Sequence, residues 1–362
     1  MRHSIQLTGV SLPAESAILR DAVVPEEIRP ADYFDDYDRH TLIYDVAEAP
    51  AGRGIVVTCP PLFNLAPIFQ KAVLKGRAHK RHKLRTSEHY ILKHRLSDLP
   101  INWDGQPGQS LRPRPDLSAE FADQNALLLM NKDNQLDWIA DWARFYAKIH
   151  GATAVVAFDN GSTSYSTGEL ASCLESIAGF ESVAVFSAPF PFGPKVKRYK
   201  RQSSMFLQNA MMNMARLTIL SKARAVLNVD PDEIVVPKGD ITVFDAAVKR
   251  RHRFVKIAGQ WVYPAPGSHW PCRQAEHHYR LSPISTCHDK WCAVPSGFMS
   301  RFGWDWHKVA DEASRPFKPD PRFEMLHCRA TTTGWKRARN ASSEKKLVLD
   351  PELRSHMPGW FG

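Results

Sequence analysis

The chain has 362 residues and a mass of 40.9 kDa, which exceeds one average domain, so we expect two domains or one elaborated domain. Hydrophobic residues make up 43% of the chain and charged residues 24%, and this ordinary globular composition argues against a largely disordered protein. The formal net charge of +10 and the pI near 9.3 indicate an anionic partner: nucleic acid, a phosphorylated ligand or an acidic lipid surface. No apolar run approaches the roughly 18 residues that a membrane span needs, and the six cysteines follow no disulfide framework, so we expect a cytoplasmic protein.

Positive charge is concentrated in residues 71–95, which contain nine lysine and arginine residues and a single acid, Glu88. A run of this kind is typical of a solvated helix face, of a nucleic-acid interface or of a surface that docks on anionic lipid. Tyr90 is its only aromatic residue, whereas stacking on unpaired bases needs several, so no nucleic acid is expected as a partner. We expect this run to dock on an anionic membrane surface.

The N-terminal part of the chain gives weak and irregular signals. We expect strands at residues 41–46 and 55–59 and one or two basic helices within residues 64–95. Residues 102–116 are rich in proline and glycine, which predicts a linker. The chain is therefore divided into an N-terminal accessory α+β region, residues 1–118, and a second domain, residues 119–362.

Strands and helices alternate beyond the linker. The apolar runs predict strands at 126–130, 154–158, 183–186 and 225–229, separated by helices at 136–150, 168–179 and 203–221. Repeated strand–helix units predict an α/β fold with a mostly parallel sheet flanked by helices. In such sheets the ligand site lies at the carboxyl ends of the strands, where polar segments begin at Asn131, Asp159 and Asp230.

Two carboxylates follow the last of these strands, in Asp230-Pro-Asp232. Spaced by one residue, they can converge on Mg²⁺ or Mn²⁺, cations that take oxygen ligands and neutralise the charge of a diphosphate leaving group. The pattern alone is weak, because acidic residues are common in turns. Asp159 has a similar alternative, since Asp-Asn-Gly is ordinary turn chemistry and predicts an Asx-turn.

Three motifs, taken in order, resemble family-2-like glycosyltransferases with a GT-A fold. They are the polar stretch at Asn131 with a Trp-bearing helix behind it, the strand end Asp159-Asn-Gly-Ser162, and the strand Leu227-Asn-Val-Asp-Pro-Asp-Glu-Ile234, which resembles the D-x-D-E strand end of those enzymes. The resemblance covers residues 124–236 and departs from the family pattern at Lys132-Asp133, where an Asn-Glu pair is usual. It implies a GT-A-like fold and a transferase that depends on a nucleotide sugar.

The resemblance also implies a donor site. One group of residues would contact the nucleotide base or ribose, a second would contact the donor sugar or its phosphates, and the D-x-D carboxylates would hold the diphosphate with Mn²⁺ or Mg²⁺. The residues implied are, in that order, Asp159, Arg201 with Gln202, and Asp230 with Asp232, and Asn131 is expected to belong to the same donor-binding set.

The C-terminal third supplies candidates for the remaining chemistry. Sugar transfer with inversion needs a carboxylate that takes the proton of the acceptor hydroxyl. The implied candidates are Asp305, Asp311 and Glu312, and the alternative for them is a solvated amphipathic helix. His327 ends a short apolar run and would complete the metal shell, unless it is a hydrogen-bonded core histidine. Lys290 is expected to pair with a phosphate or to face water.

Together these features predict a metal-dependent glycosyltransferase that moves a sugar from a nucleotide-sugar donor to a glycan or lipid-linked acceptor. The resemblance implies a role in bacterial envelope polysaccharide synthesis, with the enzyme on the inner face of the membrane. The alternative is a nucleic-acid-binding protein that uses residues 71–95. Release of nucleoside diphosphate from a nucleotide sugar discriminates between the two.

Overall fold

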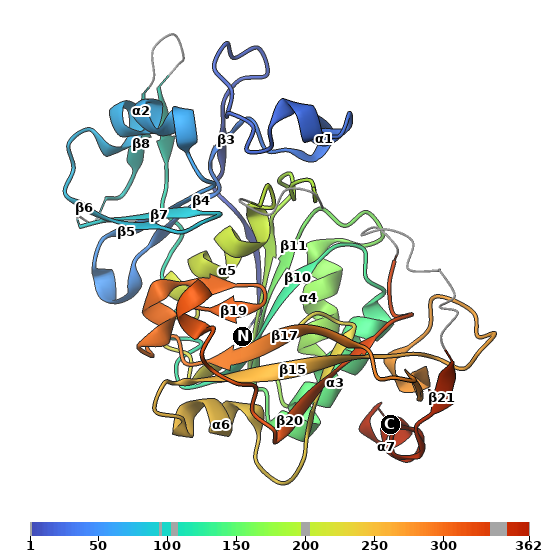
Figure 1. Ribbon diagram of the computed structural model, residues 1–362. Helices are drawn as coiled ribbons and strands as arrows, with labels where there is room; N and C mark the ends of the chain where they lie inside the picture. Colours follow the sequence, from blue (N-terminus) through green and yellow to red (C-terminus); the bar gives the residue numbers. More distant parts are fainter. Residues whose placement is uncertain (1, 94–95, 103–107, 197–202, 334–345, 362) are drawn as a thin grey trace. The chain divides into compact units, whose positions relative to one another are not determined.

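The computed structural model describes residues 2–93, 96–102, 108–196, 203–333 and 346–361 (Figure 1). They form two compact units, each built from more than one segment of the chain. The large unit comprises Met1–Ile5, Phe121–Phe186 and Ala223–Gly362, and the small unit comprises Gln6–Glu120 and Ser187–Lys222. The functional division of the chain between residues 118 and 119 stays a prediction.

A nine-stranded sheet forms the centre of the large unit. Its order is β1 (Arg2–Gln6), β12 (Ser182–Ser187), β11 (Ala154–Asp159), β10 (Asn125–Asn131), β13 (Ala225–Asn228), β17 (Thr286–Ala293), β15 (Phe254–Val262), β20 (Phe323–Cys328) and β14 (Glu233–Pro237). Strand β10 pairs in parallel with β11 and β13, so Asn131 lies beside Asp159, whereas β17 pairs antiparallel to β13. The predicted strands at the centre of this sheet are confirmed.

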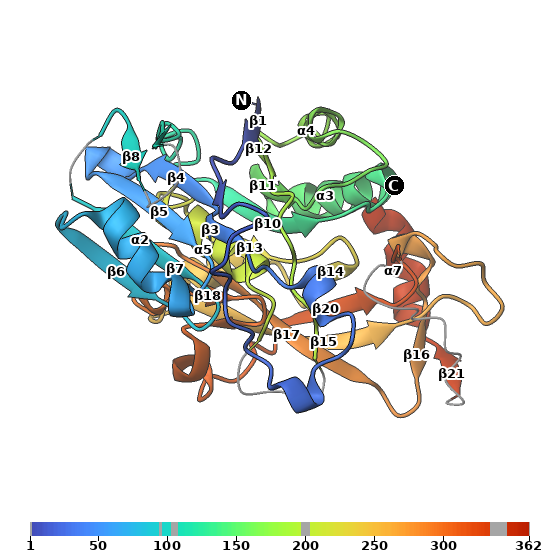
Figure 2. The ribbon, with the colours of Figure 1, turned by 90° about the horizontal axis from the view of Figure 1, so that it is seen from above.

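Helices cover one face of the sheet. The side chains of Leu127, Leu129 and Val155 alternate along their strands and share one core with helices α3, α4 and α6, and α3 lies beside α4 (Figure 2). The α/β class, with a sheet flanked by helices, is therefore confirmed. The helices of the large unit are α3 (Leu136–His150), α4 (Thr167–Glu175), α6 (Val243–Lys249) and α7 (Pro351–Phe361). Two short ladders outside the nine-stranded sheet pair β16 (Tyr279–Leu281) with β21 (Leu347–Leu349) and β18 (Trp304–Asp305) with β19 (Lys308–Val309).

Helix α3 has the boundaries that the sequence predicts. Its apolar side chains recur at helical spacing and include Trp138, Trp142 and Phe145, all buried. It ends at Gly151, whose φ of 65° is left-handed, a conformation that glycine adopts without steric cost.

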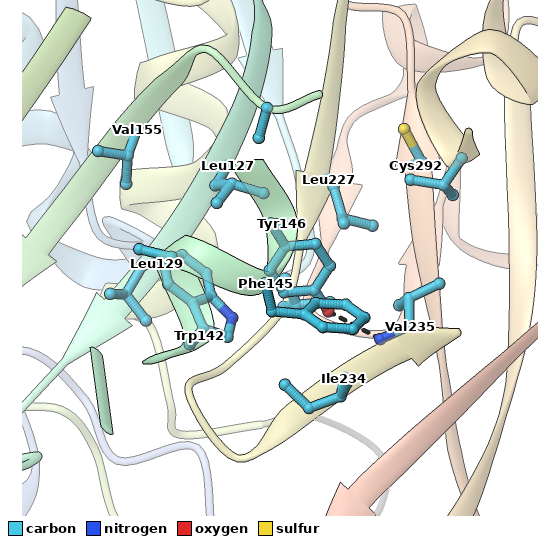
Figure 3. Packing of buried hydrophobic residues seen from close by; sticks show 14 of the residues in the cluster. Leu127, Leu129, Trp142, Phe145, Tyr146, Val155, Leu227, Ile234, Val235 and Cys292 are labelled. Atoms are coloured by element: carbon cyan, nitrogen blue, oxygen red, sulfur yellow. Dashed lines mark hydrogen bonds between the residues drawn. The ribbon is translucent and has the colours of Figure 1, made fainter. Parts of the chain in front are cut away.

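The core between α3 and β14 contains the buried hydroxyl group of Tyr146 (Figure 3). This hydroxyl donates a hydrogen bond to the carbonyl oxygen of Glu233 at 2.9 Å and accepts one from the N–H of Val235 at 2.9 Å. Trp142 and Phe145 belong to the same apolar cluster. The two hydrogen bonds thus attach the first residues of β14 to helix α3.

Replacing Tyr146 with phenylalanine removes both hydrogen bonds while keeping the ring. We expect the free energy of unfolding, measured by urea denaturation, to fall by about 1–3 kcal/mol. Tyr279→Phe is a matched control, because no described residue is seen to hydrogen-bond its hydroxyl group, and we expect a change within about 0.5 kcal/mol. Equal losses in the two variants would contradict a structural role for the Tyr146 hydroxyl.

The small unit is an α+β structure built around a four-stranded antiparallel sheet, which confirms the additional α+β region. The sheet order is β4 (Asp45–Glu48), β5 (Ile55–Cys59), β7 (Glu88–Leu92) and β6 (His79–Lys83). Two short ladders pair β2 (Val10–Ser11) with β3 (Thr41–Ile43) and β8 (Leu99–Ile101) with β9 (Gln109–Leu111). The helices are α1 (Tyr33–Asp36), α2 (Ala66–Phe69) and α5 (Leu207–Leu217). No helix in the described part of the chain combines the length and the apolar character that crossing a membrane requires.

The prediction of basic helices within residues 64–95 is right only for the first part of that segment. Helix α2 and the π-turn at Gln70–Leu74 lie there, but β6 and β7 form an antiparallel pair. Tyr90 and Leu92 alternate along β7 into the apolar core of the unit, while β6 is an exposed edge strand. A run of charge carries no periodicity, so it could not distinguish a helix from an edge strand.

Candidate functional site

The turn between β13 and β14 carries the two carboxylates of the D-x-D pattern. The N–H of Asp230 donates to Glu233 Oε2 at 2.8 Å, and the N–H of Glu233 donates back to the carbonyl oxygen of Asp230 at 2.9 Å. This closed turn leaves the Asp230 and Asp232 side chains 20% and 14% exposed, while that of Glu233 is buried. The turn therefore presents two partly solvated carboxylates above a buried one.

Asp232 and His327 are brought together, as the sequence predicts. Strands β14 and β20 pair antiparallel with Glu233 opposite His327, and His327 Nε2 lies 3.1 Å from Asp232 Oδ2. The imidazole stacks on the indole of Trp261, with ring centroids 4.0 Å apart, and the Arg329 guanidinium lies 4.9 Å from the same indole. The sequence gives no signal for Trp261 and Arg329, because the β15–β20 pairing alone places them here.

Lys290 is a buried cation beneath the turn. Its ammonium lies 2.8 Å from Glu233 Oε2 and 3.4 Å from Asp230 Oδ2, and its side chain is 1% exposed. Burial alone would lower the pKa of Lys290, but the carboxylates of Asp230 and Glu233 raise it. Lys290 is therefore charged at neutral pH, and it pairs with carboxylates instead of facing water.

The hairpin of β18 and β19 is attached to the end of the sheet beside this cluster. The side-chain amide of Asn228 donates a hydrogen bond to the backbone carbonyl oxygen of Trp306 at 2.9 Å. The indole N–H of Trp291 donates one to the backbone carbonyl oxygen of Asp305 at 2.7 Å. These bonds hold the segment between the two short strands against β13 and β17.

His307, in this hairpin, is a further member of the site that sequence reasoning missed. Its ring stacks on that of His288, with centroids 4.5 Å apart. Burial, and then the charge of Lys290 and the neighbouring His288, lower the pKa of His307 to about 2, while Asp230 opposes the shift. A neutral imidazole therefore lies within electrostatic reach of Asp230 and Lys290.

The three candidates for the catalytic base lie in different surroundings. Asp305 Oδ1 accepts the N–H of His307 at 3.2 Å, within the hairpin. Asp311 and Glu312 are 50% and 57% exposed and lie 3.9 and 3.2 Å from the ammonium of Lys308, as expected for a solvated surface turn. Among the described residues, none of the three carboxylates is seen to bond to Asp232 or His327, so their catalytic roles stay predictions.

Asn131 and Asp159 meet at the ends of β10 and β11. The side-chain amide of Asn131 donates to Asp159 Oδ1 at 2.7 Å, and Ser162 donates to both carboxylate oxygens, through its N–H at 2.9 Å and its hydroxyl at 2.6 Å. This is the geometry of the Asx-turn alternative, so the nucleotide contact of Asp159 stays a prediction. The remaining implied donor residues, Arg201 and Gln202, lie outside the described residues.

The predicted metal trio is not assembled as a three-ligand site. In the described segments no three His, Cys, Asp or Glu side chains converge on a common point, and Asp230 is paired with Lys290. Asp232 and His327 together offer one carboxylate and one imidazole. Mg²⁺ and Mn²⁺ commonly take one or two protein ligands and complete their shell with substrate phosphates, so this pair fits such an ion together with a diphosphate.

No protein-family model matches this chain, and no curated protein is significantly similar to it. Solved structures similar to parts of it are the mannosyltransferase Ktr4p from S. cerevisiae, at 16% identity over 40% of this chain and 41% of that chain with a TM-score of 0.26; the galactosyltransferase LgtC with donor and acceptor sugar analogues, at 11% identity over 53% and 64% with a TM-score of 0.29; and S. aureus TarS with UDP, at 12% identity over 58% and 58% with a TM-score of 0.28. The matched regions thus span less than two thirds of those proteins. Similarities this low carry no argument about fold or activity, and the function must be argued from this chain's own residues.

Proposed function

We propose that this protein is a glycosyltransferase that transfers a sugar from a nucleotide-sugar donor to a glycan or lipid-linked acceptor. The observation that carries the proposal is the pairing of Asp232 with His327 beside the cluster of Asp230, Glu233 and Lys290. The turn that carries Asp230 and Asp232 follows the buried strand β13 at the carboxyl end of the parallel part of the sheet, where α/β folds bind ligands. Bacterial envelope polysaccharide synthesis is the process to which we assign the activity.

The chain's own residues suit the departure of a diphosphate. Asp232 and His327 would hold Mn²⁺ or Mg²⁺, which when bound neutralises the charge that develops on the leaving diphosphate. Lys290 holds Asp230 and Glu233 in place by ion pairs, so the turn is rigid before the donor binds. Asp305, on the hairpin attached to this edge of the sheet, is the base candidate we favour for taking the proton of the acceptor hydroxyl.

The test is release of nucleoside diphosphate from a panel of uridine and guanosine diphosphate sugars, with Mn²⁺ or Mg²⁺ added or removed by a chelator. We expect turnover of at least one donor, dependent on the cation and lost in Asp232→Ala. Tight binding of a nucleic-acid oligomer, with no release from any donor, would favour the nucleic-acid-binding alternative and overturn the proposal.

Asp159 tests the nucleotide end of the site. Asp159→Ala removes a buried carboxylate at the end of β11, and we expect the dissociation constant for nucleoside diphosphate to rise about tenfold to a hundredfold, the effect of one charge-assisted hydrogen bond. Calorimetric titration measures it. Glu181→Ala, on the same unit but in the loop before β12, is the control and should leave the constant unchanged. If the dissociation constant for nucleoside diphosphate is unchanged in Asp159→Ala, Asp159 acts only in the Asx-turn and does not contact the nucleotide.

We also propose that residues 71–95 dock the protein on anionic lipid. Strand β6 is an exposed edge that presents Lys80 and Lys83, and each lysine near such a surface contributes about 1 kcal/mol. The double variant Lys80→Gln/Lys83→Gln should therefore bind phosphatidylglycerol vesicles at least tenfold more weakly in co-sedimentation. The matched control Lys238→Gln/Lys249→Gln removes two exposed charges of the large unit and should bind as the parent chain does. Equal pelleting with neutral and anionic vesicles would contradict docking.

A further inference from the structure

Two aromatic rings are exposed on the segment between β17 and β18 of the large unit. Phe298 and Phe302 lie on turn 298–302, which contains the 3₁₀ helix Met299–Phe302, and they are 61% and 53% exposed. Their rings form a T-shaped contact, with centroids 5.3 Å apart. A single exposed apolar side chain is ordinary on a protein surface, whereas two adjacent rings form one apolar patch and indicate an interaction surface.

Turn 298–302 is anchored to the body of the unit by the buried side chain of Ser300. The hydroxyl of Ser300 donates a hydrogen bond to the carbonyl oxygen of Val294 at 2.7 Å and accepts one from the indole N–H of Trp304 at 3.0 Å. Because these bonds fix the inward side of the turn, the two rings on its other side stay in water.

Arginine side chains flank the two rings. Arg301 is exposed and its N–H donates to the carbonyl oxygen of Phe298, and residues three apart in a 3₁₀ helix project on the same side. Arg253, also exposed, packs against the start of the turn, because a methyl group at Gly297 would lie only 2.6 Å from the Cβ of Arg253. The N–H of Val294 donates to the carbonyl oxygen of Arg253 at 2.9 Å, which holds the two segments together.

No nearby carboxylate offsets the charge of these two arginines. Residues 294–303 contain no aspartate or glutamate, and within the described ranges neither arginine is seen to pair with a carboxylate. The acids of the following turn, Asp311 and Glu312, are balanced by their ion pairs with Lys308 and Arg315. The surface around the two rings therefore carries net positive charge.

Exposed rings beside uncompensated arginines suit the interface of an anionic bilayer. Aromatic side chains bury their rings at the boundary between headgroups and acyl chains, and guanidinium groups are attracted to the anionic headgroups. A symmetric contact with a second copy of this chain would instead bring like charges together. We infer that turn 298–302 inserts Phe298 and Phe302 into an anionic lipid surface, with Arg301 and Arg253 against the headgroups.

This surface is separate from the sites already proposed. Strand β17 ends where β13 begins, with Ala293 paired to Val226, so the segment that leads to the turn starts at the end of β13 opposite to Asp230. Strand β6, the other proposed lipid contact, belongs to the small unit. The inference does not depend on sugar transfer, and it adds insertion of apolar side chains to docking by charge alone.

Co-sedimentation of the full chain with vesicles measures binding, and the rise in surface pressure of a lipid monolayer measures insertion, each with phosphatidylglycerol and with phosphatidylcholine. We expect the parent chain to bind phosphatidylglycerol vesicles and to raise the pressure of that monolayer. Phe298→Ser/Phe302→Ser should bind at least tenfold more weakly and lose most of the pressure rise, because the apolar area is gone. Its melting temperature should stay within about 2 °C of that of the parent chain, since both rings are exposed.

Arg301→Gln tests the charged part of the surface. It should weaken binding to phosphatidylglycerol about fivefold, the effect of one basic residue near an anionic surface, and leave any binding to phosphatidylcholine unchanged. Lys80→Gln/Lys83→Gln removes charge from the small unit only, so it should keep the pressure rise at protein concentrations that restore its binding.

The matched control is Ile284→Ser/Val348→Ser, which removes two apolar side chains of the same unit that are 55% and 45% exposed, and it should bind and insert as the parent chain does. A parent chain that raises no pressure, a Phe298→Ser/Phe302→Ser chain that inserts normally, or an equal loss in the control would each overturn the inference. A dimer in sedimentation velocity that only Phe298→Ser/Phe302→Ser disrupts, with vesicle binding unchanged, would assign the turn to a contact between copies instead.

Discussion

Replacing Asp232 with alanine is expected to reduce sugar transfer at least a hundredfold while leaving the melting temperature within about 2 °C of that of the parent chain. The activity falls because Asp232, whose Oδ2 lies 3.1 Å from His327 Nε2, would hold the cation that neutralises the leaving diphosphate, whereas Asp230 is already paired with Lys290. The stability is kept because the side chain lies partly exposed on a turn, so its removal opens no cavity in the core. Nucleoside diphosphate release and differential scanning calorimetry measure the two effects.

Asp240→Ala is the matched control for this variant. Asp240 is an exposed carboxylate on the loop after β14, and its loss should change neither turnover nor melting temperature. Turnover of Asp232→Ala close to that of the parent chain, with or without added cation, would remove Asp232 from the proposed site. A large drop in melting temperature would show that Asp232 is needed for folding and would contradict its placement as a functional side chain.

Replacing Lys290 with methionine is expected to lower the free energy of unfolding by about 3–5 kcal/mol. The ammonium is 1% exposed and pairs at 2.8 Å with Glu233, so the variant leaves a buried carboxylate without its counter-charge. Urea denaturation at pH 7 measures the loss. The additional replacement Glu233→Gln should recover much of it, because the remaining side chain is neutral.

Lys256→Met is the matched control, since Lys256 also pairs with a carboxylate, that of Asp289, at 3.0 Å, but both side chains are a quarter or more exposed. A solvated pair of this kind contributes only about 0–1 kcal/mol. Similar losses in Lys290→Met and Lys256→Met, or no recovery in the double variant, would show that the buried ion pair does not stabilise the turn.

The central strands of the large unit follow from the sequence because buried parallel strands need nearly continuous apolar runs. The runs 126–130, 154–158 and 225–229 correspond to β10, β11 and β13, and the tryptophan spacing of α3 predicts that helix to its last residue. The position of Asn131 beside Asp159 also follows, because parallel neighbours end at the same edge.

The second half of the same sheet does not follow in this way. Strands β15 and β17 contain mixed polar and apolar residues, with Lys256 and Gln260 in one and His288 and Lys290 in the other. Their identity as strands depends on pairing with each other and with β20, which local composition does not encode. The same reason explains why β6 was not predicted as a strand: its charged residues are equally compatible with a helix, and only its pairing with β7 makes it a strand.

By itself, the sequence determined the α/β class, the polar ends of the first strands and the acidic turn at Asp230 and Asp232, because each depends on neighbours in the chain. Only the tertiary structure decided which side chains face that turn. His327 reaches Asp232 through the register of β14 with β20, and Lys290 reaches Glu233 because β17 runs antiparallel beside β13. Ion pairs and stacked rings act over a few ångströms, so segments far apart in the chain become partners only after strand pairing has set their distance.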